Sequence, residues 1–205
     1  MTVTYRVGTG LYVNLTNRCP CACTFCIRQN GPGVYGSDPL WLEREPTADE
    51  VCESIERNLG DSSELVFCGY GEPTERLDVL LEVAERFRKN HPDIPIRVNT
   101  NGLSDLIAGE PTASRFKGLV DAVSISLNAP TAEEYVALCR PKFGAAAYPA
   151  MLKFAEEVKR FVPNAVFTVV GTESFTSEKE AACRTVAAER GIPLRVRKFT
   201  GPQEK

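Results

Sequence analysis

The sequence predicts an α/β fold in which parallel strands alternate with helices as an open, partial (β/α)6 barrel. Six short runs rich in β-branched residues are separated by longer stretches with helical periodicity. Such alternation is typical of parallel strands joined by right-handed crossovers. The chain has 205 residues, whereas a closed (β/α)8 barrel needs about 250. Hydrophobic residues make up 43% of the chain, which suffices for a buried core, so we expect residues 1–205 to form a single domain.

The expected strands are the runs in which β-branched and other apolar residues stand together. They are residues 11–15, 65–68, 96–99, 122–127, 166–170 and 194–199. In a parallel α/β barrel the loops that follow the strands build the active face. Polar residues directly after these runs are therefore the first candidates for a functional site.

Capping residues mark the starts of the expected helices. Residues 47–50 read as a capping box, in which a threonine hydroxyl and a glutamate carboxylate accept hydrogen bonds from free backbone N–H groups. Residues 131–134 and 177–180 repeat the pattern. Apolar stripes at helical spacing within residues 77–87 and 151–162 predict helices that pack against the sheet.

Net charge and hydropathy indicate which partners and which compartment to expect for the protein. Its formal net charge is −3, which argues against nucleic acid as a partner, because such proteins usually carry a basic surface. No apolar run is long enough to span a bilayer, and the first residues lack the apolar segment of a secretory signal. We therefore expect a cytoplasmic protein without a membrane partner. Its eight cysteines should be reduced there, which favours ligation or catalysis over disulfides.

A dense group of cysteines follows the first expected strand: Cys19, Cys21, Cys23 and Cys26. Thiolates select zinc or iron–sulfur centres, so a soft metal is the simplest explanation. A structural zinc site usually takes four ligands from two separated pairs, and closing a tetrahedron within one short loop would be cramped. A cubane cluster spreads its ligands over several irons, and three protein ligands on four irons leave one iron open for a substrate.

The spacing Cys19-x3-Cys23-x2-Cys26, with Phe25 before the last cysteine, resembles the CxxxCxΦC motif of the radical S-adenosylmethionine (SAM) superfamily. The resemblance implies a TIM-type partial barrel in which these three cysteines hold a catalytic [4Fe–4S] cluster and SAM binds the fourth iron. It also implies that Phe25 packs near the adenine. Cys21 is an additional thiol inside the motif, and we give it no ligand role.

The second expected strand runs into a glycine-rich turn, Gly69-Tyr70-Gly71-Glu72-Pro73. This turn resembles the GGEP motif of the same family, in which backbone groups and the glutamate bind the amino group of SAM. The resemblance assigns that role to Gly71 and Glu72. Tyr70 stands where the family motif has its first glycine. Without the resemblance, a simple turn before a helix would explain the segment.

Short polar residues also follow the next two strands. Family members use these positions to bind the ribose and carboxylate of SAM, which implies such contacts for Asn101, Ser126 and Asn128. Taken singly, each of them reads more simply as a turn residue. Cys68 would lie beside the same site.

Two further segments have open interpretations. Residues 28–46 form a long stretch rich in glycine and proline, and a loop of this length is either functional or a plain connector. It follows the cysteines directly, which makes it a candidate lid or part of a substrate pocket. In the last expected strand, Arg195, Arg197 and Lys198 either direct charge at the site or face solvent, and the latter is the commoner case.

The resemblance implies an enzyme. A reduced [4Fe–4S] cluster would cleave SAM and generate a 5′-deoxyadenosyl radical that acts on a substrate which the sequence does not name. An external one-electron reductant of the flavodoxin or ferredoxin type would be a partner. The segment of residues 11–28 is also similar to the small radical SAM proteins associated with TatD-type nucleases.

Two other functions remain open at this point. A zinc-stabilised binding module would use the thiols for structure alone and would leave Glu72, Asn101 and Ser126 without a shared purpose. A cluster-bearing electron-transfer protein would need a fourth protein ligand, for which Cys21 is the nearest candidate.

Overall fold

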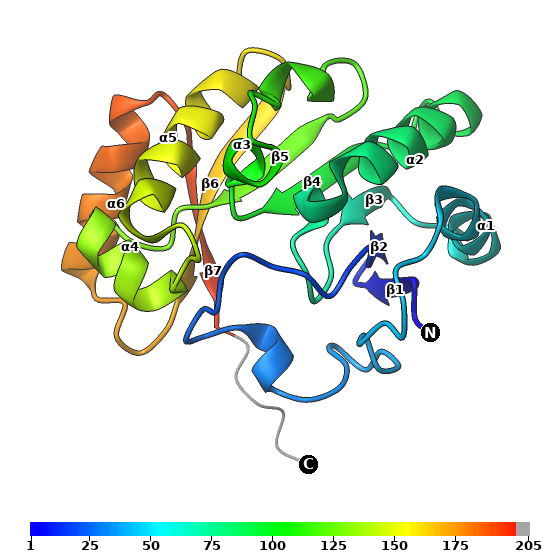
Figure 1. Cartoon of the computed structure of the whole chain (residues 1–205), viewed down its shortest axis with the longest axis horizontal. Coiled ribbons are helices and arrows are strands. Elements are labelled where there is room, and N and C mark those ends of the chain that lie inside the picture. Colours follow the sequence, from blue (N-terminus) through cyan, green and yellow to red (C-terminus); the bar gives the residue numbers. More distant parts are fainter. Residues whose placement is uncertain (200–205) are drawn as a thin grey trace.

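The computed structural model describes residues 1–199, whose strands form one seven-stranded sheet with strand order identical to chain order. Strands β2 to β7 are parallel, and β1 pairs antiparallel with β2. The sheet curves into a half-barrel (Figure 1). The strands are β1 (Thr4–Val7), β2 (Gly10–Val13), β3 (Glu64–Phe67), β4 (Ile96–Thr100), β5 (Ala122–Ser126), β6 (Asn164–Gly171) and β7 (Leu194–Lys198).

The six parallel strands are those that the sequence predicts, with ends that differ by one or a few residues. Strand β1 is an addition that the sequence pattern missed, because its four residues alternate polar and apolar without a β-branched run. A two-residue connection joins it to β2, and Gly8 has a φ of 58° there. Positive φ is typical of tight hairpin connections.

Helices follow the parallel strands and cover the outer, convex side of the sheet (Figure 1). The α-helices are α1 (Ala48–Asn58), α2 (Leu77–Asn90), α3 (Ser104–Ala108), α4 (Ala132–Cys139), α5 (Ala147–Val158) and α6 (Ser177–Glu189). Short 3₁₀ helices are η1 (Ile27–Gln29), η2 (Pro73–Arg76), η3 (Ala113–Phe116) and η4 (Gly144–Ala146).

The predicted helix caps are largely confirmed. At α1, Thr47 and Glu50 form both hydrogen bonds of a capping box. At α4 only the threonine half of the predicted box is present in the described chain, because the side chain of Thr131 accepts from the backbone of Glu134 but no return bond to the Glu134 side chain is seen. The box predicted at residues 177–180 is wrong. Helix α6 already includes Ser177, and Thr176 caps it instead by accepting from the backbone N–H of Lys179.

The two faces of the sheet differ in chemistry. Alternate strand residues such as Phe67, Val98 and Phe167 are fully buried and pack with the helices in the main core. The residues between them point to the concave face, where polar side chains such as Arg97 and Asn99 line a cavity. A closed (β/α)8 barrel fills its interior with packed apolar side chains. Here the concave face is polar and available to ligands.

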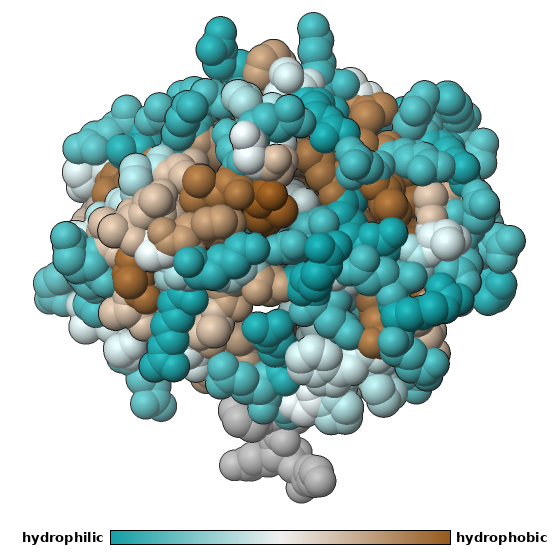
Figure 2. All heavy atoms as spheres, viewed as in Figure 1, coloured by the Kyte–Doolittle hydropathy of each residue, from teal (hydrophilic) through white to brown (hydrophobic). Residues whose placement is uncertain are grey.

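The face of the molecule seen in Figure 2 is mostly hydrophilic. In Figure 2, hydrophilic residues form most of the outline, and hydrophobic residues show mainly between them. Large hydrophobic side chains exposed in the described chain include Trp41 and Tyr35, both in the long loop before α1. Across residues 1–199, no helix combines the length and the apolar character needed to cross a membrane.

Candidate active site

The cysteine-bearing loop begins where β2 ends and runs across the open side of the half-barrel toward α4 (Figure 1). It is fixed by backbone hydrogen bonds to the end of that helix. The N–H groups of Ala22 and Thr24 donate to the carbonyls of Cys139 and Leu138 at 3.0 and 2.9 Å. The N–H of Lys142 donates to the carbonyl of Pro20 at 2.7 Å. The loop that carries the thiols is therefore joined to a distant part of the chain.

Glycines in the turn after β3 let this loop approach closely. A Cβ atom on Gly71 would lie 2.2 Å from the carbonyl oxygen of Thr16 and 2.6 Å from that of Arg18. Next to it, the N–H of Glu72 donates to the carbonyl of Arg18 at 2.8 Å. The glycine at position 71 is thus required by its contact with the cysteine loop.

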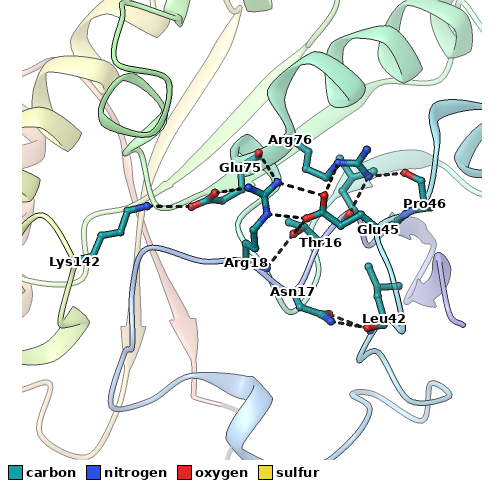
Figure 3. Close-up of polar contacts among 10 residues, drawn as sticks. Thr16, Asn17, Arg18, Leu42, Glu45, Pro46, Glu75, Arg76 and Lys142 are labelled. Atoms are coloured by element: carbon teal, nitrogen blue, oxygen red, sulfur yellow. Dashed lines mark hydrogen bonds and ion pairs between the residues drawn. The ribbon is translucent and has the colours of Figure 1, made fainter.

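A network of charged side chains holds the start of the loop in place (Figure 3). Glu45 accepts hydrogen bonds from the Thr16 hydroxyl at 2.6 Å and from Arg18 Nε at 2.7 Å, and Arg76 Nε lies 3.3 Å from its other oxygen. Arg18 also reaches Glu75 at 3.4 Å. Partial burial raises the pKa of Glu45, but hydrogen bonds from Arg18 and Thr16 outweigh that effect and hold it below its usual value. The carboxylate is therefore ionised and central to the network.

A cavity of about 540 Å³ lies at the carboxyl ends of the strands on the concave face. Its wall contains the cysteine loop, the turn after β3 and the ends of β4, β5 and β7. All of the predicted site residues line it: Cys19, Cys23, Phe25, Cys26, Gly71, Glu72, Asn101, Ser126 and Asn128. The structure thus gathers residues from four separate segments of the chain into one site.

The thiols of the site differ in their surroundings. Cys21 is buried, with 5% of its surface exposed, and its thiol contacts both Cys19 and Cys23. A hydrogen bond from Cys21 lowers the pKa of Cys19. A hydrogen bond from Cys139, followed by one from Cys21, lowers the pKa of Cys23 to about 4. Burial raises the pKa of Cys26. Cys19 and Cys23 thus favour the thiolate, and Cys21 and Cys139 act as their donors.

Sequence analysis missed Cys139. It is the last residue of α4, is 1% exposed, and accepts a 3.5 Å hydrogen bond at its sulfur from the side-chain amide of Asn128. A cysteine at the end of a partly apolar helix looks like a packing residue. Only the docking of the cysteine loop on α4 reveals its place in the site.

Glu72 is the only acidic side chain of the predicted set, and it is 4% exposed. Its carboxylate accepts hydrogen bonds of 2.7 Å from the Thr100 hydroxyl and from the backbone N–H of Asn101, and Thr74 donates from its hydroxyl and backbone. Burial raises the pKa of Glu72 against these hydrogen bonds. No lysine, arginine or histidine of the described chain forms an ion pair with it, so a cationic ligand would compensate its charge.

A buried acceptor without a partner also points to a ligand at the same cavity. The side-chain oxygen of Asn128 is buried without a hydrogen-bond partner among the described residues, and the residue has a φ of 58°. Buried acceptors are normally paired. Together with Glu72, Asn128 gives the site groups that suit the ammonium and hydroxyl groups of a polar ligand.

The long loop of residues 28–46 forms part of the cavity wall. Val34 and Leu40 are buried in a small cluster with Tyr5 and Tyr70, and Val34 and Leu40 also line the cavity. Tyr70 donates from its hydroxyl to the carbonyl of Gly31 at 2.7 Å. The tyrosine that replaces a glycine of the GGEP pattern therefore anchors this loop, which is not a loose connector.

The loop carries the donor atoms of an iron–sulfur cluster. Cys19, Cys23 and Cys26 all line one cavity, and thiolates are the protein ligands of [4Fe–4S] clusters. The thiol donor set of the loop therefore fits a [4Fe–4S] cluster.

Two sequence relatives are GTP 3′,8-cyclases. That of Paenarthrobacter nicotinovorans is 29% identical over 142 residues, which are 67% of this chain and 37% of the cyclase. That of Streptomyces coelicolor is 34% identical over 128 residues, 60% of this chain and 34% of the cyclase. The chain thus matches little more than a third of the length of either relative.

Solved structures with the same fold are more distant in sequence. SuiB of Streptococcus suis, bound to its precursor peptide SuiA, matches 96% of this chain and 40% of its own with a TM-score of 0.67 at 13% identity. The anSMEcpe protein with bound AdoMet (SAM) matches 95% of this chain and 52% of its own with a TM-score of 0.64 at 16% identity. Methylornithine synthase (PylB) matches 95% and 54% with a TM-score of 0.61 at 13% identity. These likenesses establish the half-barrel fold.

The family itself follows from the sequence. The model of the radical SAM superfamily matches residues 13–185, which include the cysteine loop and β3 to β6. This family uses a [4Fe–4S] cluster and SAM, the cofactors expected from the cysteine spacing. The chain therefore belongs to the radical SAM superfamily.

Proposed function

We propose that this protein is a radical SAM enzyme in which Cys19, Cys23 and Cys26 hold the [4Fe–4S] cluster. The observation that carries the proposal is the convergence of these thiols with the buried, cation-free carboxylate of Glu72 in one cavity. A cluster site alone would not need such a carboxylate. A site for a cationic amino acid group beside the cluster does.

Different residues of the chain contact different groups of SAM. Glu72 accepts hydrogen bonds from the SAM ammonium group, and Thr100 and the backbone of Asn101 fix its orientation. Ser126 and Asn128 contact the ribose and carboxylate from the ends of β5 and the turn that follows it. Phe25, next to the last ligand, packs against the adenine. The loop of residues 28–46 excludes water and other quenchers from the cavity.

When bound, a reduced cluster would supply the electron for cleavage of SAM to methionine and a 5′-deoxyadenosyl radical. The chain's contribution is to position SAM and the substrate and to protect the reactive species. An external reductant of the flavodoxin or ferredoxin type delivers the electron. We also propose a cytoplasmic setting, which agrees with eight free cysteines.

The relatives suggest two kinds of substrate. The cyclases are named for GTP, and the anSMEcpe protein has been crystallised with AdoMet and a peptide. This chain matches only part of each of these proteins, so neither substrate is transferred to it. The residues that line the chain's own cavity are better evidence for the class of its substrate.

The proposal is tested by anaerobic reconstitution with iron and sulfide, followed by addition of SAM and dithionite. We expect a brown protein that forms 5′-deoxyadenosine, and a Cys23→Ala variant that forms none. Lys153→Gln, a change on the exposed face of α5, is the control and should retain activity. A colourless protein with stoichiometric zinc and no 5′-deoxyadenosine would refute the proposal and favour a binding module.

A further inference from the structure

The last strand places two arginines on the concave face of the sheet. Along β7, Leu194 and Val196 pack against the main core, so the alternation of the strand turns Arg195 and Arg197 the other way. Both line the same cavity as the cysteines. Their place in the sheet is fixed by pairing with β6, where Thr168 is opposite Arg195.

Three guanidinium groups come together in this part of the cavity. Burial lowers the pKa of Arg195, and the positive charges of Arg97 and Arg197 lower it further. The charges of Arg197 and Arg97 also act on the Cys68 thiol. Cys68, which follows β3 and lines the same cavity, therefore lies near Arg97 and Arg197.

Only one of the three arginines, Arg97, forms an ion pair within residues 1–199. Arg97 forms a two-pronged pair with Glu64 at 2.6 and 3.0 Å and donates to Asn99 at 2.8 Å. Arg195 has a single long hydrogen bond, 3.4 Å to the Ser124 hydroxyl. Within the described part of the chain, neither Arg195 nor Arg197 pairs with a carboxylate.

What distinguishes these two arginines is that they lack an ion pair among the described residues and line a cavity. Most other arginines of the described chain form ion pairs. Arg195 and Arg197 are accessible to solvent and line the cavity, so their charges create a local positive potential that attracts anions. The planar guanidinium fork matches the oxygens of a phosphate or a carboxylate.

We propose that the substrate carries an anionic group, a phosphate or a carboxylate, and that Arg195 and Arg197 bind it. This inference rests on the radical SAM function proposed above and adds the substrate class. The register of the sheet places this anion site relative to the SAM contacts. Ser126 of β5 pairs with Thr168 of β6, and Thr168 pairs with Arg195 of β7, so the anion site lies two strands from Ser126. The substrate would then extend from the arginines toward the cysteine loop, which lines the same cavity.

The test uses the reconstituted, unreduced protein saturated with SAM, so that binding is measured without turnover. Titration calorimetry with pyrophosphate and with succinate distinguishes a phosphate-binding from a carboxylate-binding site. We expect at least one of the two probes to bind. Arg195→Gln and Arg197→Gln should each weaken that binding about ten-fold, as the loss of one charge-assisted contact would, and Arg197→Lys should restore part of it.

Arg160→Gln is the matched control, because Arg160 is an exposed arginine outside the cavity. It should bind the probe as the unchanged protein does. The proposal is overturned if neither probe binds, or if both cavity variants bind as tightly as the control. It is also overturned if these variants lose affinity for SAM instead, since the arginines would then hold the SAM carboxylate.

Failure of the proposed radical SAM function would be seen in other measurements than failure of the anion site. Cluster content and SAM binding are measured in the same samples before either probe is added. A protein without a cluster and without SAM affinity refutes the radical SAM proposal. Binding of the probes to the cavity arginines is still measured on that protein and is judged by the same comparison of variants.

Discussion

The backbone N–H of Asn101 donates a 2.7 Å hydrogen bond to the carboxylate of Glu72. This contact joins the end of β4 to the turn after β3, and it orients a buried negative charge toward the cavity.

Glu72→Gln keeps the shape of the side chain and removes its charge. We expect the affinity for SAM to fall about ten- to a hundred-fold, the size of a lost charge-assisted hydrogen bond of about 1.5–3 kcal/mol. Iron and sulfide content should not change, because Glu72 does not hold the cluster in this account. Calorimetry on the reconstituted protein measures the effect. Glu43→Gln, an exposed carboxylate outside the cavity, is the control, and equal SAM affinity in both variants would contradict the assignment.

Gly71→Ala tests the close approach between the turn after β3 and the cysteine loop. The new methyl group would lie 2.2 Å from the carbonyl oxygen of Thr16, so the loop must shift. We expect the free energy of unfolding to fall by about 1–3 kcal/mol, the usual cost of overpacking, and iron content to fall with it. At Gly171 the nearest atom to an added Cβ is 3.4 Å away. Gly171→Ala should therefore be tolerated, and a similar loss in both variants would show that the contact at Gly71 has no special role.

Glu45→Gln tests the charged network in Figure 3. Glu45 accepts from Thr16 and Arg18, but its side chain is 38% exposed, so solvent screens much of its charge. We expect a loss of about 1 kcal/mol or less in urea unfolding of the cluster-free protein, with slower cluster reconstitution. A variant that reconstitutes at the original rate would show that the network does not position the loop.

The lowered pKa of Glu50 predicts that the free energy of unfolding depends on pH. A hydrogen bond from Arg44, followed by one from the backbone N–H of Thr47, lowers its pKa to about 2. A carboxylate with a lowered pKa stabilises the fold above its unfolded-state value of about 4.3 and loses that contribution as pH falls toward 2. Urea unfolding of the cluster-free protein should show Glu50→Gln to be less stable than the original at pH 7. The difference should shrink between pH 4 and pH 2, whereas a constant difference would contradict the linkage.

Much of the fold could be predicted because its signals are local. The parallel strands are β-branched runs, and a threonine hydroxyl three residues before a glutamate marks the start of α1. The cysteine spacing and the Gly71-Glu72 turn are contiguous in sequence and typical of one family. Strand β1 carries no such signal, because its pairing with β2 depends on the hairpin at Gly8.

Other site residues could not be assigned from local pattern alone. Cys139 reaches the thiols only because the cysteine loop docks on the end of α4. The alternation of residues along the last strand predicts that Arg195 and Arg197 point away from the core. Only the sheet register shows that they face a cavity and not bulk solvent. The likeness to TatD-associated proteins stays a prediction.

In the proposed enzyme, three thiols hold the cluster and leave one iron for SAM. The most direct test is the EPR spectrum of the reduced cluster in the Cys21→Ser variant, recorded with and without SAM. We expect the variant to retain a [4Fe–4S] signal that shifts when SAM is added, as in the original protein. Loss of the cluster in Cys21→Ser, together with an original spectrum that does not respond to SAM, would contradict the claim and indicate a four-ligand electron carrier.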